Sequence, residues 1–488
     1  QTLPGNIFSG NNVKNLTITT EVTIPATAGQ GINLWGALNF GFMLDTLTTN
    51  GNLTLKSTAA STASIGIILA GNLVKGDVTV ERFINTGTSG GAHGKSWQFL
   101  STPTTGQTIR QAWQENGTVP AGFGTIITGT GTGFDITTVQ PSMKSYDVTT
   151  NNWKPVTNTN NLLRDSLGYM LFVRGDRSVT TSAAVANPTV LRSKGAIYQD
   201  SNQPPLVFLT ADKFQSVGNP YASRIEFSKV RTQSSVGMLD VFYVWDPSLA
   251  GYFGYGGYQT ITGVAGYVPT VGTPPTGSPA STYYPAGVSA PYIESGQAFF
   301  VKCRTSPGGY VMLTELNKAT GNRLVNRPTG SSDLPMNRGF ISASLFTAQG
   351  QIADGNIVAF ENGLSNALNE NDADKMMNPG ENFGIMRNGK LLAVEARDEV
   401  METDTVFYNI QNLKQQPYQF RFAPASMPAG IRGFLIDRYM NSTTAVSMTD
   451  SSFIDFTITD NPASYAADRF ILVFKQAFVV PVKIVSVT

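Results

Sequence analysis

The sequence predicts an all-β protein, with N-terminal β-solenoid-like coils followed by β-rich sandwich domains. Charged residues make up only 14% of the 488 residues, and the chain contains 49 Gly and 26 Pro. Short runs of alternating apolar and polar residues recur, separated by turn signals such as Asn50-Gly51. This composition favours strands and turns over helices, which prefer Ala, Leu, Glu and Lys.

Residues 1–84 are predicted to form the solenoid-like stack. Thr-centred apolar triplets begin at Val22, Leu53 and Val78, so they stand 31 and 25 residues apart. A loose period of this length is typical of coils that bury their inward faces on one another. An ordinary β-sandwich with short strands is the alternative. The end of such a stack, near Leu16 and Ile18, would expose strand edges that pair with other strands unless they are capped.

Residues 85–330 are expected to form a β-rich middle domain with long polar loops. Within it, residues 251–292 are rich in Gly, Pro and Tyr, and we expect a surface insertion without regular structure there. The strand candidates of this domain are Trp97–Ser101, Gly168–Arg174, Pro205–Thr210, Leu239–Trp245 and Gln297–Lys302.

Residues 331–475 return to alternating strands joined by short polar turns, which predicts a β-sandwich of jelly-roll or immunoglobulin-like type. A short helix is expected near Asp372–Asn378. Residues 476–488 are almost wholly apolar and β-forming, which predicts a linker or a donor-type strand that seeks a partner. The strand candidates are Phe340–Phe346, Asn356–Phe360, Leu391–Ala396, Thr405–Asn409, Tyr418–Phe422, Gly433–Asp437, Phe453–Ile458 and Arg469–Phe474.

Two scarce residue types restrict the possible chemistry. With His93 and Cys303 as the only histidine and cysteine, an internal disulfide and a zinc site built on Cys and His are excluded. The Gly87–Gly91 segment matches a serine-nucleophile pattern, but His93 follows it too closely for a catalytic triad, so we interpret it as a turn. No pair of carboxylates stands out as a glycosidase site. We therefore expect no enzymatic activity.

One segment has the composition of a cation site. Asp372, Asp374 and Glu381 lie among several Asn residues, and calcium prefers such oxygen ligands. The spacing differs from that of an EF-hand, and a capped turn is the alternative interpretation. Calcium is thus the one cofactor that the sequence suggests.

The Tyr-rich stretch supports two interpretations. Tyr252, Tyr255, Tyr258 and Tyr267 could stack on sugar rings, which would make this a polysaccharide-binding surface. The same residues serve equally well for packing one subunit against another.

Charge and hydropathy narrow the range of partners. The formal net charge is +1, so no global field attracts the chain to nucleic acid. No run of ~20 apolar residues occurs, so we expect no helical membrane span. The expected partners are other copies of this chain, other cell-surface components, or a polysaccharide.

Several segments share a further sequence character: Val78–Ile84, Trp97–Ser101, Gly168–Asp176, Gly218–Tyr221, Asp374–Asn382 and Asp468–Phe470. Together they resemble large secreted and cell-surface proteins of Bacteroidota exported by the type IX secretion system. Val480–Val487 resembles the lead-in to the C-terminal immunoglobulin-like and sorting region of such proteins. That region does not follow in this sequence, so we expect a processed or partial chain.

The resemblance implies a location outside the cell or on its outer surface, and a structural or adhesive role. It also implies O-glycosylation at Asp-Ser/Thr-aliphatic motifs, which occur here at Thr46, Ser166 and Thr405.

These observations lead to one preferred function and one alternative. We expect a non-enzymatic extracellular structural or adhesive protein, a subunit of a surface filament or layer assembled by β-strand pairing. The alternative is a carbohydrate-binding surface module that uses the Tyr-rich insertion. The residues expected to pair between copies are Leu16 and Ile18 at the stack end, and Phe478, Val480, Val482, Ile484, Val485 and Val487 in the tail.

Overall fold

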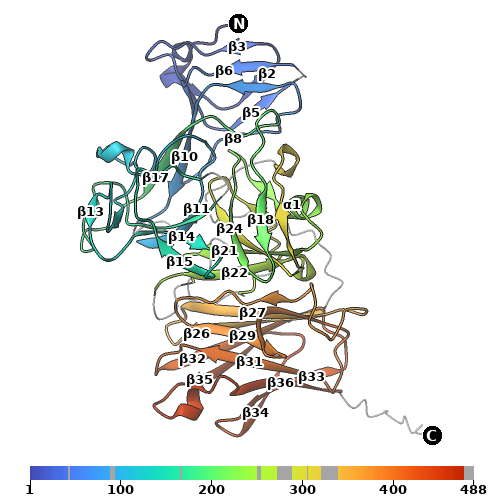
Figure 1. Cartoon of the computed structure of the whole chain (residues 1–488). Helices are drawn as coiled ribbons and strands as arrows, with labels where there is room; N and C mark the ends of the chain where they lie inside the picture. Colours follow the sequence, from blue (N-terminus) through green and yellow to red (C-terminus); the bar gives the residue numbers. More distant parts are fainter. Residues whose placement is uncertain are drawn as a thin grey trace, which may run out of the picture. The chain divides into compact units, whose positions relative to one another are not determined.

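The computed structural model describes residues 1–41, 44–87, 94–164, 167–249, 254–271, 288–304, 306–319 and 339–476. The chain divides into two compact units (Figure 1). Unit 1 comprises Gln1–Ser248 and Ser281–Ser332, and unit 2 comprises Leu249–Ala280 and Asp333–Thr488. Strands dominate both units, and the described residues contain a single α-helix, α1 (Phe227–Gln233). The predicted all-β class is therefore confirmed.

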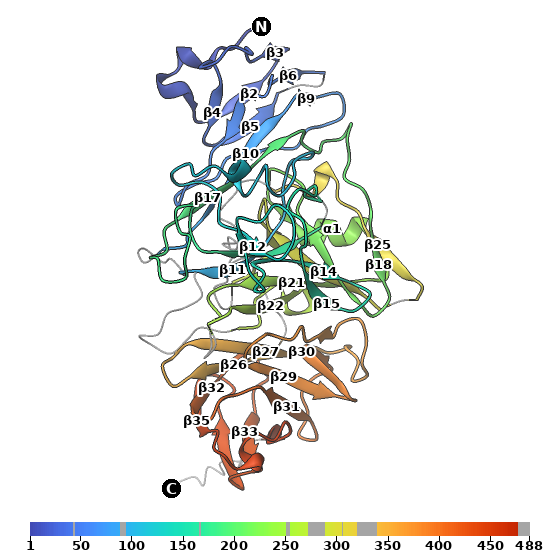
Figure 2. The same ribbon diagram turned by 60° about the vertical axis from the view of Figure 1, so that its left-hand side comes forward.

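The first 84 residues form three parallel sheets in which every third strand pairs (Figure 2). The strands stack in register, so that Leu53–Leu55 lies beside Val78–Val80 with Thr54 opposite Thr79. The first sheet contains β1 (Asn12–Val13), β4 (Ile32–Leu34), β7 (Leu53–Leu55) and β10 (Val78–Ile84). The second contains β2 (Leu16–Ile18), β5 (Ala37–Phe40) and β8 (Ser64–Ile65), and the third β3 (Val22–Thr23), β6 (Thr46–Thr48) and β9 (Leu73–Lys75).

The apolar residues of the alternating triplets form the core of this stack. Leu53 and Leu55 are fully buried on either side of the outward-facing Thr54, and Val78 and Val80 repeat the arrangement around Thr79. Each strand is only two to seven residues long. Stability must therefore come from the burial of successive inward faces on one another rather than from any single strand.

The rest of unit 1 consists of small antiparallel sheets around an aromatic core. Phe300 stacks on Phe99 with ring centroids 4.7 Å apart and meets Tyr146 and Trp153 edge-on. One sheet has the order β11 (Ser96–Leu100), β16 (Tyr169–Val173), β14 (Met143–Asp147) and β15 (Asn152–Pro155). Another contains β19 (Phe214–Gly218), β24 (Ala298–Cys303) and β21 (Met238–Asp246). The remaining pairs are β12 (Thr128–Gly129) with the parallel β13 (Ile136–Thr137), β18 (Val207–Thr210) with β25 (Gly308–Val311), and β20 (Ile225–Glu226) with β23 (Tyr292–Ile293).

Unit 2 contains one 11-stranded sheet that nearly closes on itself like a barrel (Figure 1). Its inward side chains form a single core that includes Phe383, Phe420 and Phe422, each fully buried. The strand order is β34 (Ser442–Val446), β33 (Ile431–Asp437), β36 (Phe470–Gln476), β31 (Thr405–Gln411), β29 (Asn382–Arg387), β30 (Lys390–Arg397), β27 (Ile352–Phe360), β26 (Gly339–Thr347), β32 (Pro417–Ala425) and β35 (Ser452–Thr457), with β28 (Ala373–Asp374) beside β30. All eight strands predicted in this region are present, but they form one continuous sheet where a two-layer sandwich was expected.

Two local predictions are wrong. Residues 372–378 form no helix, because Ala373 and Asp374 pair with β30 and the flanking residues are buried. Within the stretch expected to be an irregular surface insertion, β22 (Gly257–Thr262) is a strand buried along its whole length. Gly and Thr residues give this stretch the composition of a turn, so the sequence did not predict a strand here.

Candidate binding surfaces on the parallel sheets

One end of the three parallel sheets is covered by later parts of unit 1. The edge of β10 pairs with the antiparallel β17 (Thr189–Gly195). At β8, the Ile65 amide donates to the Ala222 carbonyl at 2.9 Å, and the Ser223 hydroxyl donates to the Ile65 carbonyl. The edges of β10 and β8 at this end therefore both have partners.

The edge of β9 is covered by a side chain instead of a strand. The Val74 amide donates to Gln199 Oε1 at 2.9 Å, and Gln199 Nε2 donates to the Val74 carbonyl at 3.0 Å. The Gln199 amide thus supplies the donor and acceptor that a neighbouring peptide group would supply. Gln199 is buried, so both hydrogen bonds are shielded from water.

At the opposite end of the sheets, one of the three strand edges is covered. Residues Gln1–Leu3 lie along β3, where the Leu3 amide donates to the Thr23 carbonyl at 2.9 Å and the Thr23 amide to the Gln1 carbonyl at 2.7 Å. Within the described chain, β1 and β2 are edge strands that pair on one side only, with β4 and β5. The predicted pairing residues Leu16 and Ile18 both lie on β2, where Ile18 is buried and Leu16 half-buried.

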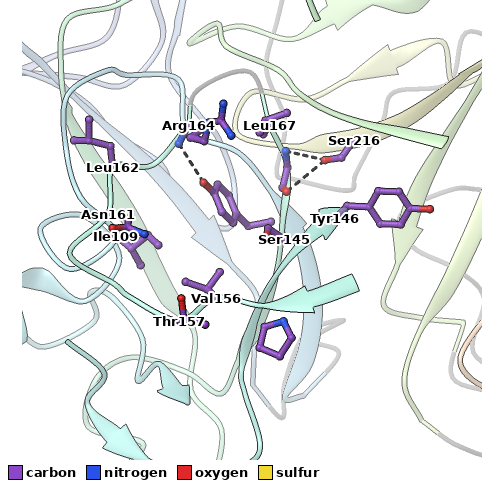
Figure 3. Close-up of a pocket in the computed structure, with 13 residues that line it drawn as sticks. Ile109, Ser145, Tyr146, Val156, Thr157, Asn161, Leu162, Arg164, Leu167 and Ser216 are labelled. Atoms are coloured by element: carbon purple, nitrogen blue, oxygen red, sulfur yellow. Dashed lines mark hydrogen bonds between the residues drawn. The ribbon is translucent and has the colours of Figure 1, made fainter. Parts of the chain in front are cut away.

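A separate pocket of about 280 Å³ lies in the middle part of unit 1 (Figure 3). Ile109, Val156 and Leu167 line it together with several polar groups. The polar groups meet one another: the Arg164 amide donates to the Tyr169 hydroxyl at 3.3 Å, and the Gly168 amide to Ser216 Oγ at 2.9 Å. Because these hydrogen bonds are already made within the protein, we assign the pocket no ligand.

The predicted sugar-stacking tyrosines do not form one exposed platform. Tyr255 is 47% exposed, whereas Tyr258 is only 4% exposed and lies in the buried β22. Tyr267 is half-buried and has a positive φ of 58°. Tyr252 lies outside the described residues.

The carboxylates of the predicted calcium ligands Asp372 and Glu381 accept hydrogen bonds from other groups of the protein. The Asp372 carboxylate accepts from the Asn369 and Ala396 amides, both at 2.9 Å, and Glu381 Oε1 accepts from the Tyr418 hydroxyl at 3.2 Å. Asp374 lies on β28 and is 7% exposed. Across the described residues, no three acidic, His or Cys side chains come together in a way that could hold a metal ion.

Other residues named from the sequence are placed as follows. Thr46 and Thr405 are half-buried at the first positions of β6 and β31, and Cys303 is fully buried in β24. Ser166, His93, most of the Gly87–Gly91 segment and the tail residues Phe478, Val480, Val482, Ile484, Val485 and Val487 lie outside the described residues.

Two further findings bear on function. No helix in the described part of the chain is long and apolar enough to cross a membrane. The chain matches no protein-family model, no curated protein and no solved structure.

Proposed function

We propose that this chain is a non-enzymatic structural or adhesive protein that acts outside the cell or on its outer surface, and that copies of it assemble by β-strand pairing. The observation that carries the proposal is the difference between the two ends of the parallel sheets. Three edges at one end have partners, whereas two of the three at the other end have none among the described residues. Unpaired strand edges are templates for adding another strand.

The three parallel sheets are, in this proposal, the faces of a β-solenoid. The in-register stacking of β4, β7 and β10 supports this interpretation. In such a stack a further coil or strand adds to the last one without disturbing it, because each coil contacts only its neighbours.

The backbone of β2 defines what an added strand would meet. The Ile18 carbonyl accepts from the Gly41 amide at 2.7 Å, so Ile18 directs its polar groups toward β5. Successive residues of a strand direct their N–H and C=O groups to opposite edges. The Thr17 amide and carbonyl therefore face the open edge, and the Thr17 side chain is exposed.

The strand that we propose as the partner is the tail of another copy, residues 477–488. Phe478, Val480, Val482 and Ile484 occupy every second position, so their side chains would share one face of a strand. Pairing of the tail of one copy with β2 of the next joins two different surfaces. Such a contact is heterologous, and it propagates into a fibre if the rotation does not close a ring.

The test compares Thr17→Pro with Thr17→Val. Proline removes the outward amide and is tolerated at a strand edge, whereas valine keeps the amide and the β-branched shape. We expect fibres in negative-stain electron microscopy and fast-sedimenting species for the unchanged protein and Thr17→Val, and monomers for Thr17→Pro. Removal of residues 477–488 should have the same effect as Thr17→Pro. Fibres that survive both changes, or an unchanged protein that stays monomeric, would refute the proposal.

The location outside the cell rests on a different argument. The segments Val78–Ile84, Trp97–Ser101 and Gly168–Asp176 resemble exported surface proteins of Bacteroidota, and a strand-paired surface filament or layer suits that setting.

A further inference from the structure

A polar groove of about 380 Å³ lies on the outer face of the first parallel sheet. Its floor includes one straight row of side chains that crosses four strands: Asn33 on β4, Thr54 on β7, Thr79 on β10 and Lys194 on β17. The backbone register places each of these residues directly opposite the next. Neighbouring strands are ~4.8 Å apart, so the Asn33 amide and the Thr54 and Thr79 hydroxyls follow one another at about this interval. The Lys194 side chain reaches back across β10 and places its ammonium beside Gly51, in the turn before β7.

A second row of charged side chains runs beside the first. Glu81 lies opposite Arg192 in the β10–β17 pairing, and Lys56 follows β7 on the other side of Glu81. Lys56 Nζ is 2.5 Å from Glu81 Oε1, and the Ser57 amide donates to Glu81 Oε2 at 3.2 Å. Glu81 is therefore held in the second row by Lys56 and the Ser57 amide.

Two segments from a different part of the sequence form the wall. The single Arg192 Nε–H is shared by both Glu115 carboxylate oxygens, each 3.0 Å from Nε, and Arg192 Nη2 donates to Glu115 Oε2 at 2.7 Å. Glu115 and Asn116 both have positive φ values, 48° and 55°, which are uncommon for residues other than glycine. Residues held in this region of the backbone map are enriched at ligand sites.

An aromatic ring completes the wall. Phe123 is placed by the loop that pairs with β17, where the Gly124 amide donates to the Val190 carbonyl at 3.0 Å. The Arg192 guanidinium lies 4.2 Å from the centroid of the Phe123 ring, and Lys56 Nζ lies 5.9 Å from it. The groove thus combines an apolar ring with donors and acceptors of hydrogen bonds.

The charges that line the groove leave one cation unmatched. Lys56, Arg192 and Lys194 contribute three positive charges, while Glu81 and Glu115 contribute two negative ones, each of which is already in an ion pair. Lys194 is exposed at the end of the first row, and its backbone amide donates to Gln107 Oε1 at 2.6 Å. A ligand that lies along the floor would meet the amide and hydroxyl groups of the row and, beside them, the Lys194 ammonium near Gly51.

We propose that this groove binds a linear saccharide chain that carries carboxylate groups, laid across the strands from Asn33 toward Lys194. Hydroxyl groups of sugars both donate and accept hydrogen bonds, which suits a floor made of amide, hydroxyl and charged groups. A sugar carboxylate would pair with the Lys194 ammonium, and the aliphatic face of a ring would pack on Phe123. Such a saccharide would be the ligand of the proposed adhesive role, on which this proposal rests, and the groove is separate from the β2 edge.

The experiment measures binding of hexagalacturonate and of neutral cellohexaose to the full chain by isothermal titration calorimetry. Thr79→Tyr fills the middle of the floor, and Thr23→Tyr makes the same change at an outward position of β3 that lies outside the groove. We expect hexagalacturonate to bind the unchanged protein and Thr23→Tyr alike, and Thr79→Tyr to bind it at least about tenfold more weakly.

A second variant tests the charge without altering the sheet. Lys194→Met keeps an unbranched side chain at this exposed position but removes the ammonium, so we expect the fold to be retained. It should weaken hexagalacturonate binding severalfold and leave any cellohexaose binding unchanged. The proposal is overturned if the unchanged protein fails to bind hexagalacturonate, if Thr79→Tyr binds it normally, or if Lys194→Met makes no difference. Because Thr17→Pro leaves the groove intact, failure of strand assembly and failure of saccharide binding are distinguishable.

Discussion

Asp354 and Lys375 form an ion pair in the interior of unit 2. Lys375 Nζ donates to Asp354 Oδ1 at 2.8 Å, and their side chains are 2% and 0% exposed. Asp354 Oδ2 also accepts from the Phe383 amide at 2.6 Å. Burial raises the pKa of the Asp354 carboxyl, although Lys375 and the backbone amides oppose that shift. The Lys375 ammonium stabilises the buried Asp354 carboxylate, because an isolated charge is costly to bury.

Lys375→Met should therefore destabilise unit 2 by about 3–5 kcal/mol at pH 7, because it leaves the buried carboxylate unpaired. A raised pKa in the folded state means that protonation of Asp354 favours folding, so its contribution is lost as the pH rises through the folded pKa. The variant should thus lose less stability at pH 4 than at pH 7, and Asp354→Asn should rescue it partly. Urea denaturation at both pH values measures these differences. Equal losses at the two pH values would contradict the prediction.

Asp147 illustrates the opposite case, a carboxylate near the surface whose side chain is 23% exposed. Its pKa is lowered to about 2, chiefly by a hydrogen bond from Lys154, with further bonds from the Thr149 amide and the Thr150 hydroxyl. The stabilisation from these contacts is present above the unfolded pKa of ~3.9 and is lost as the pH falls through about 2.

Lys154→Ala should raise the pKa of Asp147 toward its ordinary value, because the largest cause of the shift is removed. Carboxyl carbon chemical shifts followed by NMR from pH 1.5 to 6 measure it directly. Lys213→Ala provides a control on a lysine that takes no part in these contacts, and it should leave the titration of Asp147 unchanged.

At the scale of single elements, the edge of β9 depends on the buried Gln199 amide described above. Gln199→Leu removes both hydrogen bonds and leaves the Val74 amide and carbonyl unpaired. At ~1–3 kcal/mol for each buried unsatisfied group, we expect a loss of about 2–4 kcal/mol in the stability of unit 1. Gln203→Leu, a nearby exposed glutamine, is the matched control and should change stability little. Thermal unfolding followed by circular dichroism compares the two variants.

Individual strands were predictable because alternation identifies a half-buried strand wherever it occurs. The triplets that begin at Leu53 and Val78 even pair with each other, as their spacing suggested. Where a strand is buried on both faces, apolar and polar residues need not alternate, so the sequence pattern no longer identifies it. The β22 strand has no polar face exposed, and its Gly and Thr residues gave the impression of a loop.

The incorrect helix at 372–378 has a related cause. Its Asp and Asn residues are typical of helix caps, yet they hydrogen-bond to neighbouring backbone and the segment pairs with β30. The polar groove was not predictable at all. Its residues come from segments between Asn33 and Lys194 that only the register of four strands and two loops brings together.

At the scale of the whole molecule, the two units are expected to unfold in separate transitions. Val271 packs with Leu249, Phe346 and Ile352 in a small core of unit 2, although it precedes the second part of unit 1 in the sequence. Val271→Ala should cost about 2 kcal/mol and lower the melting temperature of the unit 2 transition alone. Val236→Ala makes the same change at a site that is 90% exposed in unit 1, and should shift neither transition. Differential scanning calorimetry separates the outcomes, and a shift in both transitions would argue against independent units.

The interleaved sequence of the two units also has a consequence for synthesis. The strand β24 of unit 1 pairs with β19 and β21, but it is translated only after β22 of unit 2. While the ribosome is still producing β24, unit 1 lacks a central strand, and β22 lacks β27, which it contacts in the finished protein. The nascent chain therefore passes through a stage in which both units are incomplete and their apolar strands are exposed, which is when a chaperone has most to shield.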